Sequence, residues 1–323
     1  MSPVSDDATA LPTILIRSLP FDDNERATLR SAAQGHARLV FDDPHHPEPL
    51  QGITAIAGAV TDEELAGLPG LRWIHLWSAG ADHILRPALA ARPDIVLTAS
   101  LGNGAPSLAE SALWAMLLLA RGGWQWAQAQ ADHRWERRHN VELQGQTLGL
   151  IGLGRSGSHL AGIARAMGMR VIATRRTPVE DDRVDAVYPP DRVRELMAAS
   201  DVVVITAPLT PDTRGMIGEA ELRAMKPTAT LINVSRGEVT DREALERALT
   251  EGWFAGAALD AHHVEPLPAD SILWDLPNVI VTPHNAATSL ASKQRAVATF
   301  TDNLPRFAAG LPLLHTVDRD AGY

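Results

Sequence analysis

The sequence has 323 residues, 45% of them hydrophobic, and carries a formal net charge of −10. This size and apolar content predict a globular protein of about two domains. The acidic balance disfavours nucleic acid and anionic membranes as partners, because both attract basic surfaces, and the absence of cysteine excludes disulfides, thiolate metal ligands and a cysteine nucleophile.

Neither the start of the chain nor its apolar runs are typical of a membrane or secreted protein. The longest apolar run, residues 112–120, is far shorter than the roughly 20 residues that a membrane helix needs. Residues 1–10 are polar and acidic, unlike a signal peptide. We therefore expect a cytoplasmic protein.

The first hundred residues contain short apolar segments that predict the strands of a small α/β unit. These segments are Thr13–Arg17, Thr54–Gly58, Trp73–Leu76 and Ile95–Thr98. The next segment, Ser107–Arg121, has the apolar density of a buried helix. Because it leads directly to the next motif, we expect the chain to cross into a second domain here.

The segment Thr147–Gly157 reads TLGLIGLGRSG and predicts a dinucleotide-binding turn between a buried strand, Leu148–Leu153, and a helix that includes His159–Met167. In this G-x-G-x-x-G spacing, the first glycine permits a tight turn, the second lets pyrophosphate approach the backbone, and the third lets the helix pack closely on the strand. The three glycines are Gly152, Gly154 and Gly157. The helix N-terminus then offers N–H groups to the phosphates. By themselves the glycines also fit an ordinary strand-to-helix turn.

Two arginines follow the next strand, where an acidic residue would contact the adenosine ribose of NAD(H). Arg175 occupies about the position expected for that acid, and Arg176 follows it. Two guanidinium groups favour a 2′-phosphate, so the pair predicts NADP(H) rather than NAD(H). The alternative is a solvated basic pair without a ligand.

Strands continue to alternate with helical segments after the glycine turn, which predicts a doubly wound parallel sheet. The predicted strands are Arg170–Thr174, Asp201–Thr206, Thr230–Val234, Ala255–Asp260 and Val279–Thr282. A helical segment, Ser289–Ala309, and an extended tail complete the chain, and we expect them to return to the first domain.

Three polar residues at or after strand ends are candidates for chemistry, because ligands of open α/β sheets bind outside the carboxyl ends of the strands. Arg236 can bind a carboxylate with two parallel hydrogen bonds and polarise a carbonyl. His284, the only histidine expected at a strand end, can exchange a proton near neutral pH, and Glu265 can hold its imidazole and favour the charged form. Each also has a structural alternative: a salt bridge, a buried histidine and a surface acid. The adjacent His262 and His263 lack the ligand spacing of a metal site, so we expect none.

Several longer motifs, in consistent order from about Trp73 onward, resemble the D-isomer-specific 2-hydroxyacid dehydrogenase family. They are Ala207-Pro208-Leu209-Thr210 with Thr213, Met225-Lys226-Pro227, Ile232-Asn233-Val234-Ser235-Arg236-Gly237, Ala257-Ala258-Leu259-Asp260, Glu265-Pro266-Leu267-Pro268, Leu273-Trp274, Pro277-Asn278-Val279, Thr282-Pro283-His284, and Val317-Asp318 with Gly322-Tyr323.

The resemblance implies an α/β protein of two Rossmann-like, doubly wound domains. The substrate domain would comprise residues 1–104 and 286–323, and the dinucleotide-binding domain, residues 105–285, would be inserted in it. Arg236, Glu265 and His284 would be catalytic. Substrate carboxylate would also meet the loop Ser78-Ala79-Gly80-Ala81-Asp82, whose N–H groups can form an anion site. The cofactor contacts implied are Gly152, Gly154, Arg155, Ser156, Gly157, Arg175, Arg176, Ala207, Thr213, Val234, Ser235, Arg236, Asp260 and His284.

Three residues depart from the family pattern. Ser156 replaces an isoleucine in the glycine turn, and Arg175 replaces an acid; both put NAD preference in doubt. Asn285 stands where an apolar residue is common and is expected to contact the substrate side chain or the nicotinamide.

The resemblance therefore predicts an NADP(H)-preferring reductase of small 2-oxo acids, similar to glyoxylate/hydroxypyruvate reductases, that also accepts NAD(H) and forms a homodimer. Two alternatives remain open. One is a dehydrogenase of another small acid, such as formate or phosphite, although formate dehydrogenases of this family carry glutamine where Glu265 stands. The other is a dinucleotide-sensing corepressor that binds partner proteins.

Overall fold

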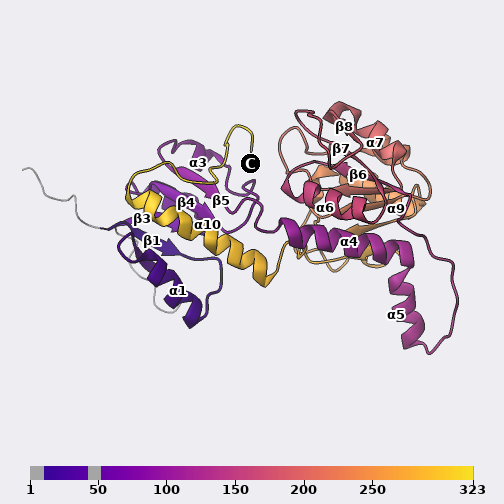
Figure 1. The fold of residues 1–323 in the computed structure, drawn as a ribbon, viewed down its shortest axis with the longest axis horizontal. Helices are drawn as coiled ribbons and strands as arrows, with labels where there is room; N and C mark the ends of the chain where they lie inside the picture. The colour runs from indigo at the N-terminus through magenta and orange to yellow at the C-terminus, as the bar shows by residue number, and fades with distance from the viewer. Residues whose placement is uncertain (1–10, 43–51, 323) are drawn as a thin grey trace, which may run out of the picture. The chain divides into compact units, whose positions relative to one another are not determined.

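The computed structural model describes residues 11–42 and 52–322, which fold into two compact units. Unit 1 comprises the described residues of Met1–Asn103 and Leu290–Tyr323, and unit 2 comprises Gly104–Ser289 (Figure 1). Unit 2 is thus inserted between the two halves of unit 1 along the chain. The sequence placed the boundaries after residues 104 and 285; the unit boundaries follow residues 103 and 289. Residues 1–10 and Tyr323, which entered the sequence analysis, lie outside the described residues.

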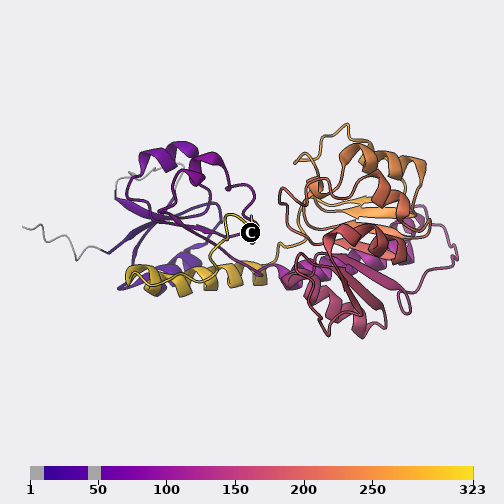
Figure 2. The same ribbon diagram turned by 90° about the horizontal axis from the view of Figure 1, so that it is seen from above.

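Unit 1 contains a five-stranded parallel sheet in the order β2-β1-β3-β4-β5. The strands are β1 (Thr13–Ile16), β2 (Arg38–Phe41), β3 (Ile53–Ala57), β4 (Trp73–Leu76) and β5 (Val96–Ala99), and the helices are α1 (Asp23–Ala33), α2 (Asp62–Gly67), α3 (Pro87–Ala90) and α10 (Leu290–Ala308). Apolar residues of α1 and α10 cover one face of the sheet, and those of α2 and α3 cover the other. Figure 2 shows α10 running along its face of the sheet.

Unit 2 contains a seven-stranded parallel sheet in the order β12-β11-β10-β9-β6-β7-β8. The strands are β6 (Thr147–Ile151), β7 (Arg170–Thr174), β8 (Ala186–Tyr188), β9 (Val202–Ile205), β10 (Thr230–Asn233), β11 (Gly256–Leu259) and β12 (Val279–Val281). The order reverses between β6 and β9, which is the point where open α/β sheets bind ligands.

Helices cover both faces of the unit 2 sheet. Those helices are α4 (Ala105–Arg121), α6 (Arg155–Ala166), α7 (Val193–Ala199), α8 (Glu219–Ala224) and α9 (Arg242–Glu251). The unit also contains α5 (Gly123–Ala131) and short 3₁₀ turns at Pro190–Arg192, Gly237–Val239 and Ile272–Trp274. One core contains residues of α4 and α6, and the other contains residues of α7, α8 and α9. The structure therefore confirms the predicted doubly wound α/β fold.

Small side chains allow α4 to pack closely on α6. Ala109, Ala112 and Ala115 of α4 are buried in the same core as Ala161 and Ala164 of α6. The helix ends at Gly122, whose φ of 59° lies in the left-handed region that glycine adopts without strain. Helix α4 begins one residue after the boundary between the units and belongs entirely to unit 2.

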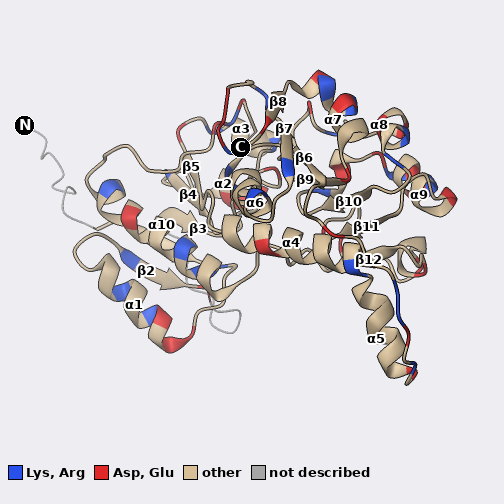
Figure 3. Cartoon of the chain, turned by 45° about the vertical axis from the view of Figure 1, so that its right-hand side comes forward, with Lys and Arg blue, Asp and Glu red and all other residues tan. Residues whose placement is uncertain are grey.

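Helix α5 and the segment after it extend away from the sheet of unit 2 (Figure 3). Residues 134–143 have no regular secondary structure. Trp135 in this segment is 95% exposed. In the part of the chain that the structure describes, we find no helix with the length and apolar character needed to cross a membrane.

Candidate active site

The three glycines of the predicted dinucleotide turn differ in what surrounds them. Gly152 has a φ of 103°, and a Cβ there would lie 2.7 Å from the backbone nitrogen of Ala207. A Cβ on Gly157 would collide with the carbonyl oxygen of Gly152, so α6 can approach the turn only with glycine at this position. A Cβ on Gly154, by contrast, would meet nothing within 4 Å. Gly154 is thus not required by internal packing, and the open space beside it fits the approach of a pyrophosphate.

The N-terminus of α6 lies directly after this open space. Gly154 is the N-cap residue, and no side chain caps the helix. The N–H groups of the first turn, from Arg155 to Gly157, and the positive end of the helix dipole are therefore free to serve a phosphate. The N–H of Gly152 donates to Thr174 Oγ1 at 3.1 Å, which links the turn to the end of β7. These residues fit the dinucleotide that the sequence predicted.

Arg175 and Arg176 follow β7 and have exposed side chains. The Arg175 N–H donates to the carbonyl oxygen of Tyr188 at 3.0 Å, which fixes the backbone at this point. The loop also carries Asp181, whose pKa is held below its ordinary value, mainly by the Arg183 guanidinium and to a smaller extent by the charge of Arg175. Asp181 forms an ion pair with Arg183, with 2.5 Å between Oδ2 and Nη2.

Arg236 follows the carboxyl end of β10 in a short turn, which the buried side-chain amide of Asn233 stabilises. The Asn233 side chain is 1% exposed. It accepts a hydrogen bond from the Ser235 N–H at 3.1 Å and donates one to the Arg236 carbonyl oxygen at 2.9 Å. Gly237 then packs against the backbone of His262, where any Cβ would collide. The turn of Arg236 and the loop after β11 are thus held against each other within unit 2.

Glu265 and His284 form the pair that the sequence predicted. His284 Nδ1 lies 2.8 Å from Glu265 Oε2 and 3.0 Å from Oε1, and both side chains are just over one-third exposed. The carboxylate also accepts the His262 N–H at 2.9 Å. Burial opposes ionisation of Glu265, but the hydrogen bonds from the His262 N–H and the His284 ring outweigh it and hold the Glu265 pKa below its ordinary value. His284 Nε2 has no hydrogen-bond partner among the described residues.

The adjacent histidines 262 and 263 point to different backbone carbonyl groups. His262 Nε2 lies 2.9 Å from the Thr282 oxygen, and His263 Nε2 lies 2.8 Å from the Thr240 oxygen. Within residues 11–42 and 52–322, no group of three potential metal ligands occurs. The structure also corrects one expectation: His284 is not the only histidine near a strand end, because His262 follows β11 by three residues and is 7% exposed.

Two of the predicted cofactor contacts, Ser235 and Ala207, join the loop after β10 to the loop after β9. The Ser235 hydroxyl donates to the carbonyl oxygen of Ala207, which follows β9. Thr213 folds back on the same segment, with its hydroxyl donating to the Pro208 oxygen at 2.7 Å. Ala207, Thr213, Val234 and Ser235 thus belong to the carboxyl-end loops of neighbouring strands, although their contact with a cofactor remains a prediction.

A pocket of about 170 Å³ lies at the carboxyl ends of β10, β11 and β12, beside α4. Its lining includes Ser111, Trp114, Val234, Asp260, Thr282 and Asn285. Val234, Asp260 and Asn285 were predicted from the sequence as site residues, and Thr282 belongs to one of the family motifs. Ser111 and Trp114 were not predicted as site residues, because only the packing of α4 brings that helix to the strand ends.

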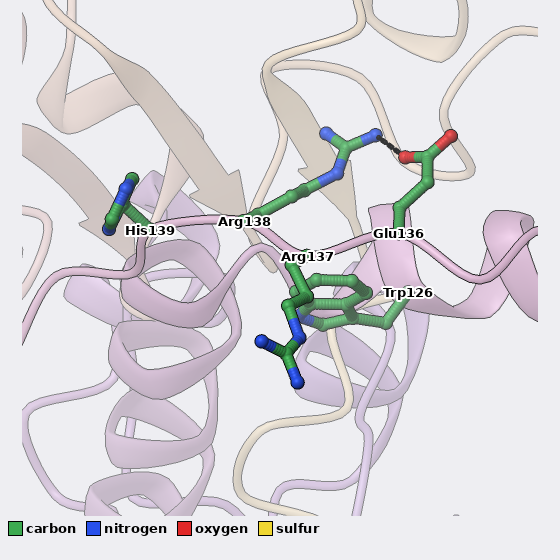
Figure 4. Close-up of a pocket in the computed structure, with 5 residues that line it drawn as sticks. All are labelled: Trp126, Glu136, Arg137, Arg138 and His139. Carbon is green, nitrogen blue, oxygen red and sulfur yellow. Dashed lines mark hydrogen bonds and ion pairs between the residues drawn. The ribbon is translucent and has the colours of Figure 1, made fainter.

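A second hollow, of about 480 Å³, lies beside α5 (Figure 4). Its lining is Trp126 and residues 136–139, with Arg138 bonded to Glu136 at 2.8 Å. None of the predicted site residues lines it. The candidate active site of unit 2 is therefore the strand-end pocket and not this hollow.

The predicted carboxylate-binding loop belongs to unit 1 and follows β4. The Ser78 hydroxyl donates to the Gly80 carbonyl oxygen at 2.9 Å, and the Ser100 N–H donates to the Ser78 oxygen at 3.0 Å. Ala81 is 1% exposed. The loop containing Ser78, Ala79 and Gly80 is thus anchored at both ends to unit 1, and its role stays a prediction.

Comparisons with known proteins agree with this description. Residues 113–286 match the model of the D-isomer specific 2-hydroxyacid dehydrogenase NAD binding domain. A glyoxylate reductase from Aeropyrum pernix is 35% identical over 284 residues, which cover 83% of this chain and 82% of that protein. The structure of a D-isomer specific 2-hydroxyacid dehydrogenase from Xanthobacter autotrophicus with NADPH and MES is 30% identical, with a TM-score of 0.85, and the match covers 97% of this chain and 100% of the other. An NADPH-dependent glyoxylate/hydroxypyruvate reductase from Sinorhizobium meliloti, solved with NADP and sulfate, is 29% identical with a TM-score of 0.84 and the same coverage.

Proposed function

The chain belongs to the D-isomer-specific 2-hydroxyacid dehydrogenase family, and from this premise we propose that it reduces glyoxylate, hydroxypyruvate or a similar small 2-oxo acid to the D-2-hydroxy acid. As a member of that family it is an oxidoreductase that acts on a CH–OH group and uses a nicotinamide dinucleotide. The observation that carries the choice of reaction is the Glu265–His284 pair, because it presents an imidazole held by a carboxylate on one nitrogen and open on the other.

Some residues of the proposed site hold the substrate, and others transfer the proton. The cofactor, when bound, supplies the hydride. Arg236 binds the substrate carboxylate and stabilises negative charge that develops on the keto oxygen, because a guanidinium can serve both groups. The N–H groups of the Ser78–Asp82 loop add a second site for the carboxylate.

His284 donates the proton that the reduced oxygen needs. Glu265 occupies Nδ1, so the proton leaves from Nε2, and the carboxylate stabilises the imidazolium that must be present before each reduction. In the oxidation direction the same nitrogen accepts the proton, which requires the neutral ring.

We also propose that NADPH is the preferred cofactor. The support is the exposed Arg175–Arg176 pair after β7, where NAD(H)-dependent proteins place an acid. The neighbouring Asp181 is bonded to Arg183. The two structural relatives described above were also solved with NADPH or NADP.

The test is turnover by the purified full chain with a panel of 2-oxo acids and both reduced cofactors. Consumption of NADPH with glyoxylate or hydroxypyruvate, at least tenfold more efficient than with NADH, is the expected result. Oxidation of formate or phosphite without 2-oxo acid reduction would instead favour a dehydrogenase of one of those acids. Cofactor binding without turnover of any acid would overturn the enzymatic proposal and favour a dinucleotide sensor.

Family resemblance further supports a homodimer. Light scattering during size-exclusion chromatography should then give about twice the 34.7 kDa of one chain. A mass of one chain at micromolar concentration would refute the dimer.

A further inference from the structure

We propose that Asp260 is a positioning residue for His284, which it serves by holding the backbone on which the imidazole stands. The inference rests on the proposed function of His284 as the proton donor. It differs from the role that family resemblance implies for Asp260, which is contact with the cofactor.

Three consecutive N–H groups turn toward Asp260. The His284 N–H donates to the Asp260 carbonyl oxygen at 2.8 Å. The next two N–H groups, of Asn285 and Ala286, donate to the two carboxylate oxygens at 2.8 and 2.9 Å. The turn that carries His284 is therefore wrapped around one residue at the end of β11.

Other contacts also hold the Asp260 carboxylate in place. Asp260 is 5% exposed, and the Thr282 hydroxyl donates to its Oδ1 at 2.7 Å. Its own N–H donates to the Asn233 oxygen at 2.9 Å, which continues the pairing of β10 with β11. Oδ1 thus has two donors from the chain, a full complement for a carboxylate oxygen in this geometry.

His284 needs such support because its backbone conformation is unfavourable. Its φ is 51°, in the left-handed region that non-glycine residues rarely adopt. Surrounding bonds must hold a residue in this state. From this position the ring reaches Glu265, so a relaxed backbone would carry Nδ1 away from the carboxylate.

Helix α4 fixes the other side of the same turn. The hydroxyl groups of Ser107 and Ser111 donate to the Ala286 carbonyl oxygen at 3.1 and 3.0 Å. The N–H and the carbonyl of Ala286 are therefore both bonded, and Asp260 supplies the anchor nearest to His284. We infer that the loss of Asp260 displaces the imidazole while it leaves the glycine turn at β6 unchanged.

The experiment compares three substitutions around this anchor with one matched control. Asp260→Asn keeps the shape but directs an NH₂ group at one of the N–H donors of the turn. Thr282→Val removes one bond to the carboxylate without a change of charge, and Thr282→Ser restores the hydroxyl. Asp201→Asn is the control, because that carboxylate also accepts a backbone N–H, from Thr147, but lies at the amino end of the central strand β9, whereas Asp260 follows the carboxyl end of β11.

We expect Asp260→Asn to lower kcat for 2-oxo acid reduction by about 30- to 100-fold, since an ångström of displacement in a reacting group costs about that much. Thr282→Val should lower kcat by about 3- to 10-fold and Thr282→Ser should restore it. The Kd for NADPH should stay within about threefold in all of these variants. Asp201→Asn should reduce the melting temperature and leave kcat unchanged.

A crystal structure of Asp260→Asn tests the inference without activity. We expect the His284 Nδ1 to Glu265 distance to exceed hydrogen-bonding range, about 3.5 Å, and the φ of His284 to leave the left-handed region. An unmoved imidazole, or a tenfold weaker Kd for NADPH with normal kcat at saturating cofactor, would overturn the positioning role. Absence of 2-oxo acid turnover in the unmodified protein would instead refute the proposed function, and the crystal structure would still decide whether Asp260 holds the turn.

Discussion

Two histidines, one within a strand of unit 1 and one shortly after a strand of unit 2, have opposite surroundings. His75 of β4 is fully buried, with Nδ1 2.9 Å from Thr98 Oγ1 and Nε2 3.2 Å from Ser100 Oγ. His284, after β12, is partly exposed and bonds through Nδ1 to a carboxylate. Burial, aided by the nearby His315, lowers the pKa of His75 to about 3, so this ring stays neutral. Burial thus keeps His75 from exchanging protons near neutral pH, whereas solvent reaches His284.

The largest difference between the two histidines should appear on substitution by glutamine. His284→Gln removes the proton donor and should lower kcat/KM for reduction by about 10²–10⁴-fold with little loss of stability. His75→Gln should leave kcat within about threefold and lower the melting temperature, because it disturbs a buried hydrogen-bond network. Steady-state kinetics and thermal unfolding of both variants make the measurement, and equal losses of kcat would break the comparison.

Arg236 provides the next largest expected effect. Lysine cannot reproduce the planar two-point contact with a carboxylate, so Arg236→Lys should lower kcat/KM for the oxo acid by about 100-fold or more and leave NADPH binding nearly intact. Steady-state kinetics will measure the loss of kcat/KM for the oxo acid, and a titration with NADPH will measure cofactor binding separately. A variant with near-normal kcat/KM would mean that another residue holds the substrate.

The buried histidine should be detectable in the acid stability of the protein. Between pH 6.5 and about 3 the unfolded chain binds a proton at His75 that the folded chain does not. The free energy of unfolding is therefore fully retained above pH 6.5 and falls as the pH drops toward 3, by at most about 5 kcal/mol from this group. Urea unfolding at several pH values should show a shallower decline for His75→Gln. Parallel declines in both proteins would contradict the neutral, buried state of His75.

The cofactor end of unit 2 has a smaller expected effect. Two charge-assisted contacts to a 2′-phosphate should favour NADPH over NADH by at least about tenfold in kcat/KM. Arg175→Asp should reverse much of that preference, because the new carboxylate repels the phosphate and can accept the ribose hydroxyls. Equal efficiency with both cofactors in the unmodified protein would refute the role of the arginine pair.

The sequence predicted those parts of the molecule whose pattern is local. The glycine spacing and the continuous apolar strands of unit 2 indicated the turn, the parallel sheet and its two-sided helical cover. Strands β2 and β8 went unpredicted. Both lie at sheet edges, and Val40 of β2 is the one buried residue of the two strands, so neither shows a continuous apolar run. Helix α5 also went unpredicted, because it begins with Gly123 and has a single buried residue, Ala129.

The candidate site shows the same limit. Glu265 and His284 could be paired in advance through family motifs, but the supporting residues could not. The contacts of Asn233 with Arg236, and of Asp260 with residues 284–286, depend on how neighbouring strand ends are placed in space. The burial of His262 between Glu265 and Thr282 likewise depends on that placement.

The central claim is that Glu265 stabilises the protonated His284 that reduction requires, and paired pH profiles of kcat/KM test it most directly. Reduction of glyoxylate or hydroxypyruvate needs imidazolium, and oxidation of the matching 2-hydroxy acid needs the neutral ring. The Glu265 carboxylate is ionised near neutral pH, because its hydrogen bonds hold its pKa below the ordinary value.

In Glu265→Gln the imidazolium of His284 loses the carboxylate that stabilises its charge. The alkaline limb for reduction and the acid limb for oxidation should therefore both move to lower pH, each by about one unit, equivalent to about 1.4 kcal/mol. A solvent isotope effect on kcat/KM would establish that proton transfer limits the rate in both proteins. Limbs that stay in place in both directions under that condition would contradict the account.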